Sequence, residues 1–95
     1  MPMGNAEFDE ARKGVVSQSF EDTRLSMAKQ IGRDRCFSAE QVRSMMGAFN
    51  FEDSRLEFAK FAYDRTHDLG NYYKVNDGFD FPSSVDELNE YLGTR

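Results

Sequence analysis

The sequence has very little cysteine, little proline and no tryptophan. Its 95 residues include one cysteine, Cys36, so the fold contains no internal disulfide and does not depend on an oxidising compartment. Two prolines and seven glycines leave room for long helices. No apolar run approaches the roughly 18 residues that a transmembrane helix needs, which argues against membrane insertion. The first residues lack the basic and apolar stretches of a signal peptide. The lone cysteine favours the cytosol slightly, but the compartment stays open because a fragment of a secreted protein would look the same.

Positive charge is scarce as well. The chain carries 12 Lys and Arg against 17 Asp and Glu, a net charge of −5. After Arg65, the acidic side chains face only Lys74 and Arg95. Phosphate binding needs a basic surface, so this balance argues against nucleic acid as the main partner. The 39% of hydrophobic residues is ordinary for a folded protein, and the length fits a single domain.

A ten-residue segment is repeated. The stretch Phe20 to Lys29 recurs 31 residues later as Phe51 to Lys60, with seven of ten positions identical. Each copy has the apolar spacing of an amphipathic helix, which predicts helices over 20–31 and 51–62. Ser19 and Asn50 stand directly before the copies, where they are predicted to be the N-caps. The sequence therefore predicts a duplicated helix-pair unit.

A second kind of helix alternates with the repeated one. Ser38 and Gln41 form a capping-box pattern ahead of a helix that ends near Gly47. The segment Ser84–Leu92 has a similar pattern, with Ser84 as its cap, and a weaker relative over 8–16 is interrupted by Gly14. The segment 64–83 is too aromatic for a free loop, and we expect it to pack against the helices.

The resulting prediction is an all-α fold, a compact array of about five helices. Residues 6–93 form the single domain, and residues 1–5 form a flexible N-terminus. The order of helices is expected to alternate, with the last helix belonging to the kind that precedes each repeated segment.

Several motifs resemble those of one family, an uncharacterised helical domain of unknown function found in bacterial and animal proteins. The similarity covers about Phe8 to Leu92. It rests on the repeated Phe-Glu-Asp-x-Arg-Leu-x-x-Ala-Lys helix, Phe37–Val42, Asp68 with Asn71-Tyr72-Tyr73-Lys74-Val75, and the final Phe-x-Ser-Ser helix. The resemblance implies a helical fold and adds no activity, cofactor or catalytic residue. Bacterial members often carry this domain at the end of a secreted protein.

No catalytic or metal-binding pattern stands out. Cys36 and His67 are single residues of their types, so a nucleophilic pair would require them to meet in space, and a zinc set is excluded. Around Gly78, a calcium-loop register fails, because Tyr73 and Val75 stand where the first and third oxygen ligands belong and Ser84 stands where the final Glu belongs. Asn76-Asp77-Gly78 is better explained as a turn in which glycine takes a positive φ. We expect no enzyme activity and no cofactor.

The arginines of the repeat leave two interpretations open. Arg24 and Arg55 lie beside the apolar stripe, three residues after Glu21 and Glu52. The favoured interpretation is a pair of structural ion pairs, Arg24 with Glu21 and Arg55 with Glu52. The alternative is an anion site that uses both guanidinium groups.

Four aromatic residues form the candidate partner surface: Tyr72, Tyr73, Phe79 and Phe81. Aromatic side chains rimmed by acidic groups anchor protein interfaces, although at least two of the four are expected to belong to the core. Met45 and Met46 are expected in the core too. The function predicted from the sequence is a non-enzymatic protein-interaction module. The alternative is a small-ligand or lipid-binding helical domain with a pocket in its Phe- and Met-rich core.

Overall fold

The chain is helical apart from short connections. A computed structural model describes residues 2–94. Its elements are α1 (Asn5–Val16), α2 (Glu21–Asp34), α3 (Ala39–Met46), α4 (Glu52–Ala62), the 3-10 helices η1 (Tyr63–Arg65) and η2 (Leu69–Gly78), and α5 (Pro82–Gly93). Over residues 2–94, β-structure is limited to the isolated bridges Pro2–Cys36 and Phe37–Thr66. The predicted all-α class is therefore confirmed. Within this described part, no helix is long and apolar enough to cross a membrane.

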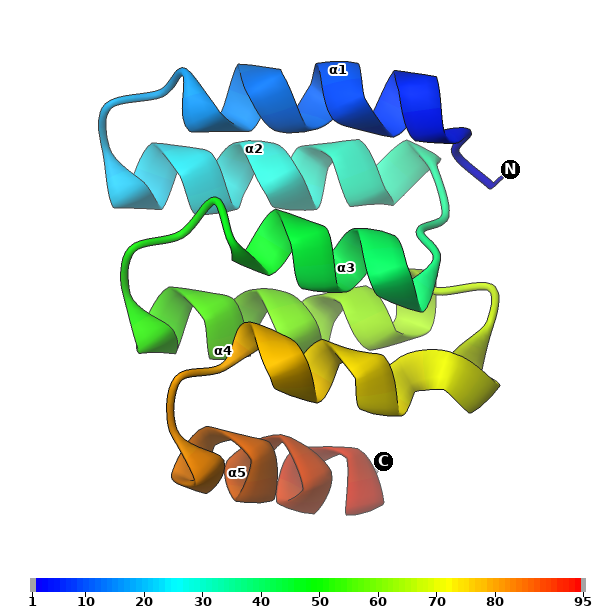
Figure 1. Cartoon of the computed structure of the whole chain (residues 1–95), viewed down its shortest axis with the longest axis vertical. Helices are drawn as coiled ribbons and strands as arrows, with labels where there is room; N and C mark the ends of the chain where they lie inside the picture. The colour runs from blue at the N-terminus through cyan, green and yellow to red at the C-terminus, as the bar shows by residue number, and fades with distance from the viewer. Residues whose placement is uncertain (1, 95) are drawn as a thin grey trace.

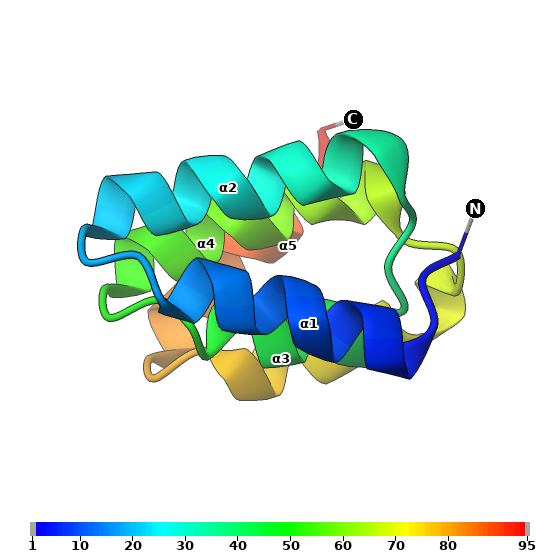
Figure 2. The same cartoon turned by 90° about the horizontal axis from the view of Figure 1, so that it is seen from above.

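The elements form two layers. One layer holds α2, α4 and α5, in which α4 contacts both of the others. The other layer holds α1, α3 and η2, in which α3 contacts η2 (Figures 1 and 2). Each element of the second layer is followed along the chain by one of the first, which gives three stacked units: α1–α2, α3–α4 and η2–α5. The connections that lead into α2, α4 and α5 all lie along the left edge of Figure 1.

The third unit corrects the predicted order of helices. The sequence pattern predicts that the last helix is of the kind that precedes each repeat, but α5 packs against α4 as α4 packs against α2. It is thus a third member of the repeated layer. The segment 64–83 is predicted to pack down, and this is confirmed: it contains η2 and the end of η1, with Tyr72 and Val75 buried. The 3-10 helix η2 takes the position that α1 and α3 hold in the other units.

Two predicted helix caps, those of the repeated helices, are wrong. Phe20 and Phe51, in extended conformation, occupy the N-cap positions of α2 and α4, not Ser19 and Asn50. Neither helix has a side-chain cap at that position. The backbone N–H groups of Asn50 and Phe51 find a different acceptor, the Glu21 carboxylate of the preceding unit.

Of the other predicted helix starts, the start of α3 is confirmed and the start of α5 is wrong. Ser84 is not a cap, because α5 begins two residues earlier at Pro82, where the missing N–H of proline costs no helical bond. The capping box of Ser38 and Gln41 is present as predicted. The interruption of the first helix at Gly14 is wrong: α1 continues through it to Val16.

The core lies between the two layers. Phe37, Phe49 and Phe58 are fully buried, and the Phe58 ring centroid lies 5.7 Å from those of both other rings. Met45 and Met46 are fully buried in the same cluster, so their assignment to the core is confirmed. One contiguous cluster reaches from Met3 to Leu88. The three units therefore share a single core.

A repeated set of contacts joins α2 to α4 and α4 to α5. Lys29 pairs with Glu57, and its Nζ lies 5.9 Å from the Phe61 ring centroid. One unit further on, Lys60 pairs with Glu87 at 3.3 Å and lies 5.1 Å from the Tyr91 ring centroid. The same relation between units occurs twice, as expected of a repeat architecture in which each unit contacts its neighbours.

Candidate functional site

The four aromatic residues of the predicted partner surface lie in different surroundings. Tyr72 is buried, its hydroxyl donates to the Ala59 carbonyl, and burial raises the pKa of its phenol. Phe79 is half-buried, whereas Tyr73 and Phe81 are 66% and 59% exposed. Phe79 and Phe81 line one groove beside α5, and Tyr73 lines another with Tyr72. The structure therefore brings Phe79 and Phe81 together and separates them from the tyrosines.

The two repeated arginines hold the connections in place. Arg24 donates to the backbone carbonyls of Val16, Gln18 and Ala48, at 2.7–2.8 Å. Arg55 Nε donates to the Phe49 carbonyl at 3.0 Å, in the same way that Arg24 Nε bonds Gln18.

The acidic partners of the two arginines differ. Arg55 Nη1 lies 3.5 Å from Glu52 Oε1 and 2.8 Å from Asp80 Oδ2. For Arg24, the charge interaction with Glu21 contributes to lowering the pKa of that carboxyl. Backbone carbonyls thus engage Arg24, whereas Arg55 is shared between the Phe49 carbonyl and the carboxylates of Glu52 and Asp80. These donors are not free to bind an external anion.

The carboxylates of Glu21 and Glu52 join each unit to the next. Glu21 accepts from the N–H groups of Asn50 and Phe51 at 3.0 Å. Glu52 accepts from the N–H groups of Asp80 and Phe81 at 3.1 and 3.0 Å, and from the Ser84 hydroxyl at 2.6 Å. These bonds fix where the start of one repeated-layer helix lies relative to the next.

The pKa values of both glutamates reflect this arrangement. Burial raises the pKa of Glu52, but the hydrogen bonds from Ser84, Asp80 and Phe81 outweigh it and leave the pKa below its ordinary value. The pKa of Glu21 is lowered by the corresponding bonds from the second unit against the same opposing burial. Both groups are therefore held as carboxylates at neutral pH.

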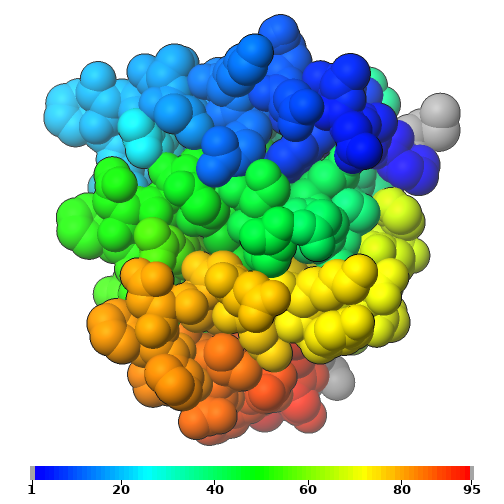
Figure 3. All heavy atoms as spheres, viewed as in Figure 1, coloured from blue at the N-terminus to red at the C-terminus, as the bar shows by residue number. Residues whose placement is uncertain are grey.

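A row of phenylalanines follows from this geometry. Phe20, Phe51 and Phe81 each occupy the N-cap position of a repeated-layer helix, and they are 75%, 63% and 59% exposed. They lie on the connections that form the left edge of Figure 1, which Figure 3 shows as one continuous side of the molecule. We call these three residues the phenylalanine row.

Sequence reasoning found only part of this row. The duplicated segment places Phe20 and Phe51 at equivalent positions. The sequence does not relate Phe81 to them and groups it with a separate set of aromatic residues. The missed signal is the tripeptide Phe49-Asn50-Phe51, which recurs 30 residues later as Phe79-Asp80-Phe81. In both copies the first ring points into the fold and the second is exposed.

Acidic side chains accompany the row. Asp22, Asp53 and Asp80, one for each unit, are exposed within two residues of a row phenylalanine. At the third unit, a groove of about 340 Å³ is lined by Phe79, Phe81, Pro82 and Val85 together with Asn76, Asp80 and Asp86. This edge therefore combines exposed aromatic rings with negative charge.

The chemistry-bearing side chains elsewhere do not assemble into a reactive centre. Cys36 is half-buried between α2 and α3, and His67 is exposed in the segment after η1. Among residues 2–94, no group of three or more His, Cys, Asp or Glu is placed to hold a metal ion. The turn predicted at Gly78 is wrong in one respect, since no glycine in this range has a positive φ. A Cβ at Gly78 would instead meet the Met46 side chain at 2.8 Å.

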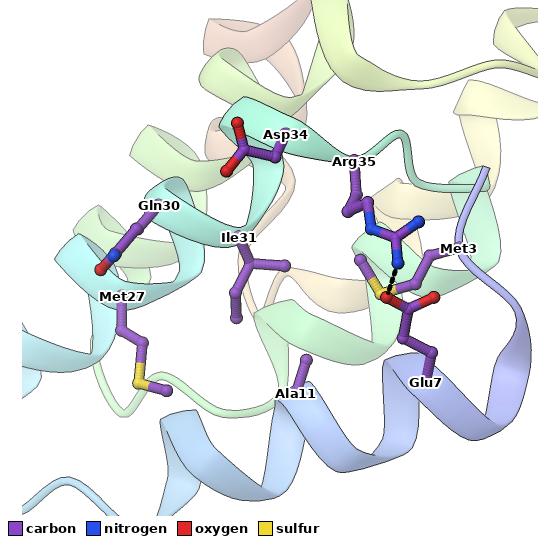
Figure 4. Close-up of a pocket in the computed structure, with 8 residues that line it drawn as sticks. All are labelled: Met3, Glu7, Ala11, Met27, Gln30, Ile31, Asp34 and Arg35. Carbon is purple, nitrogen blue, oxygen red and sulfur yellow. Dashed lines mark hydrogen bonds and ion pairs between the residues drawn. The ribbon is translucent and has the colours of Figure 1, made fainter. Parts of the chain in front are cut away.

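A further groove lies between α1 and α2, at the first unit. Its volume is about 380 Å³, and Figure 4 shows Met3, Ala11, Met27 and Ile31 between the two helices. Glu7 and Arg35 form an ion pair at one end of the groove. The groove opens at the end of the stack, and Met3 in its wall belongs to the core cluster.

The fold defines a class: a small all-helical domain whose helices pack in two layers. The family described as "Domain of unknown function (DUF4476)" matches residues 2–92, and the chain belongs to this family. This agrees with the resemblance to an uncharacterised domain family. No curated protein and no solved structure matches the chain.

Proposed function

We propose that this domain is a non-enzymatic module that binds a protein partner through the phenylalanine row. One observation carries the proposal: the same structural position in three successive units holds a phenylalanine that is 59–75% exposed. Single exposed apolar residues are ordinary, but aligned aromatic side chains rimmed by polar groups are typical of interaction sites. Aromatic anchors contribute a large share of the binding energy at protein interfaces.

The contacts of the remaining polar groups support a non-enzymatic role. Arg24 and Arg55 donate to backbone carbonyls, and Glu21 and Glu52 accept from the next unit. Catalysis by paired carboxylates would need a cleft that holds them in unlike environments. Here both glutamates accept from two backbone N–H groups of the next unit, which is a structural role.

The geometry favours a protein partner over the alternative of a small ligand or lipid. A ligand pocket within the core would need space among the Phe and Met side chains. Phe37, Phe49, Phe58, Met45 and Met46 are each at most 1% exposed and pack on one another. The groove between α1 and α2 is open at the end of the stack instead of enclosed.

Site-specific photocrosslinking tests the proposal. Benzoylphenylalanine, a photoreactive amino acid close in shape to phenylalanine, replaces Phe20, Phe51 or Phe81 one at a time in the protein expressed in its own host cell. We expect all three positions to crosslink to the same protein, because the three rings lie on one edge.

The matched control is Tyr73, an aromatic residue with similar exposure, 66%, that lies on η2 away from the row. Replacement at Tyr73 is expected to give little of that crosslinked product. The proposal fails if the three row positions give no common product, or if Tyr73 gives it in equal yield.

A further inference from the structure

The geometry points to a particular kind of partner for the phenylalanine row: an extended, arginine-rich segment in the polyproline-II conformation. This inference rests on the proposed function and names the chemistry of the occupant. It draws on the charge along the row, the spacing of its rings and the shape of the groove at its third unit.

Charge along the row selects a basic partner. The exposed residues Asp22 and Asp53 come two positions after the first two phenylalanines, and Asp86 lines the groove at the third. The cations behind the row are engaged, since Arg24 bonds three carbonyls and Arg55 bonds Phe49 and Asp80. The exposed Lys13 lies in the last turn of α1, and the exposed carboxylates of Asp22, Asp53 and Asp86 outnumber this one cation. Arginine suits this surface because a guanidinium group stacks on an aromatic face while bonding a nearby carboxylate.

The spacing of the row selects an extended conformation. Each ring belongs to one of three adjacent packed helices, whose axes lie about 8–10 Å apart. A polyproline-II chain returns to the same face every three residues, a rise of about 9 Å. A β-strand returns after about 7 Å, which is too short for the row. Every third side chain of a polyproline-II segment can therefore meet one phenylalanine.

The surface between the rings disfavours a helical partner. A helix binds in a continuous apolar groove. Along the row, exposed polar residues precede each ring: Ser19, Asn50 and Asp80. The backbone of an extended chain has N–H and C=O groups without internal partners. These groups can form hydrogen bonds with the polar residues that the chain crosses.

The groove at the third unit supplies a distinct binding position. Its apolar wall is made of Phe79, Phe81, Pro82 and Val85, and Asp86 lies at the same groove. A proline ring fits against such a wall, and an arginine beside it reaches the carboxylate. Proline-rich segments use aromatic-lined grooves of this kind because the free chain is already close to its bound conformation.

Labelled peptides test the inference with the intact protein. The probe is a peptide of four Arg-Pro-Pro repeats, about 37 Å long as polyproline II, which spans the row. Two control peptides separate the requirements: Glu-Pro-Pro repeats keep the conformation and reverse the charge, and Arg-Gly-Gly repeats keep the charge and lose the conformation. Binding is followed by fluorescence anisotropy. We expect the Arg-Pro-Pro probe to bind saturably and both controls to bind at least about tenfold more weakly.

Variants locate the binding surface. The triple substitution Phe20→Ser, Phe51→Ser, Phe81→Ser is expected to weaken binding by at least about tenfold. The control Leu69→Ser, Tyr73→Ser removes two apolar residues of η2 that are 43% and 66% exposed, and it should leave affinity within about twofold of the parent. A second variant, Asp53→Asn with Asp86→Asn, keeps every ring and should weaken binding and reduce its salt dependence.

The outcomes separate this inference from the proposed function. Equal binding of the Glu-Pro-Pro or Arg-Gly-Gly peptide, or unchanged binding by the triple variant, overturns the partner assigned here. Failure of the Arg-Pro-Pro probe does so as well. If photocrosslinking from the row still yields one common protein in that case, the interaction module stands and only its partner class is wrong. Strong binding of a basic helical peptide in place of the probe would identify a helix as the occupant.

Discussion

Among single residues, Glu52 illustrates how this fold uses charge. Its side chain is 16% exposed and accepts three hydrogen bonds from the next unit, while Arg55 lies 3.5 Å away. Hydrogen bonds to a charged acceptor contribute about 1.5–3 kcal/mol, more than neutral ones. This carboxylate therefore acts as a joint between α4 and α5, although the sequence suggested a simple ion pair within one helix.

We expect Glu52→Gln to lower the free energy of unfolding at neutral pH by about 1–3 kcal/mol, because the amide is a weaker acceptor for the same donors. Urea denaturation measures this loss. Glu10→Gln, the same substitution at an exposed position of α1, is the control and should change stability by less than about 0.5 kcal/mol.

The pH dependence of the Glu52→Gln effect follows from the lowered pKa of Glu52. An unfolded glutamate titrates near pH 4.3, and the folded group titrates below that value. The stabilisation is therefore complete above about pH 4.3 and is lost as the pH falls through the folded pKa. The difference in stability between the parent and Glu52→Gln should narrow as the solution is acidified. A difference that stays constant would show that the charge of Glu52 is not the cause.

At the scale of the helix, substitution of glycine by alanine is expected to have opposite effects on stability at two positions. Gly14 lies inside α1 and Gly32 inside α2, both with ordinary helical φ. A Cβ at Gly14 would meet only the terminal methyl of Met27, at 2.8 Å. A Cβ at Gly32 would meet the rings of Phe61 and Phe37 at 2.9 and 3.0 Å.

Gly14→Ala should therefore stabilise the protein by about 0.5–1 kcal/mol, since the flexible Met27 side chain can move and alanine favours the helix. Gly32→Ala should destabilise it, because displacing two packed rings costs about 1–3 kcal/mol and exceeds the gain in helix propensity. Urea midpoints of the two variants compare them directly. A gain in both would mean that the rings over Gly32 yield easily.

The helices themselves were largely predictable from the sequence, and the third unit was not. The repeated helices and the Ser38 capping box depend on local patterns that a sequence displays. In α5, the residues that would join it to a further unit are replaced. Pro82 occupies the position of Glu21 and Glu52 in the other helices, and Glu90 occupies the position of Lys29 and Lys60. Among residues 2–94, α5 is the last helix of this layer, and Pro82 and Glu90 are exposed, so the similarity that reveals a repeat is lost.

The phenylalanine row was beyond local patterns for a related reason. Sequence spacing places a ring before each helix, but only the packing of α2, α4 and α5 sets three such rings along one edge. Likewise, the division between buried Tyr72 and exposed Tyr73 depends on the 3-10 geometry of η2, which apolar spacing did not indicate.

For the whole molecule, the two ends of the stack carry polar residues at certain positions. The equivalent positions on the inner helix faces hold the residues that join one unit to the next, which we call joining residues. On α2, Ser26 and Gln30 take the positions that Glu57 and Phe61 hold on α4. On α5, Asp86, Asn89 and Glu90 stand where α4 has Leu56, Ala59 and Lys60. Terminal units with polar outer faces keep repeat proteins soluble and finite. We therefore expect the polar ends to keep copies of the domain from joining head to tail.

Restoring the joining residues should convert the finite stack into an open assembly. The variant carries Pro82→Glu, Asp86→Leu, Asn89→Ala and Glu90→Lys on α5, with Ser26→Glu and Gln30→Phe on α2. Its last helix then presents to the α2 of another copy what α4 presents to α5, and such head-to-tail contacts do not close on themselves unless the rotation happens to form a ring. Sedimentation should show the parent as a monomer and the variant growing with concentration. A matched variant with Pro82→Gln in place of Pro82→Glu lacks the carboxylate that bonds the next helix start, and it should assemble more weakly. A folded variant that remains monomeric would show that the joining residues identified here do not determine where the stack ends.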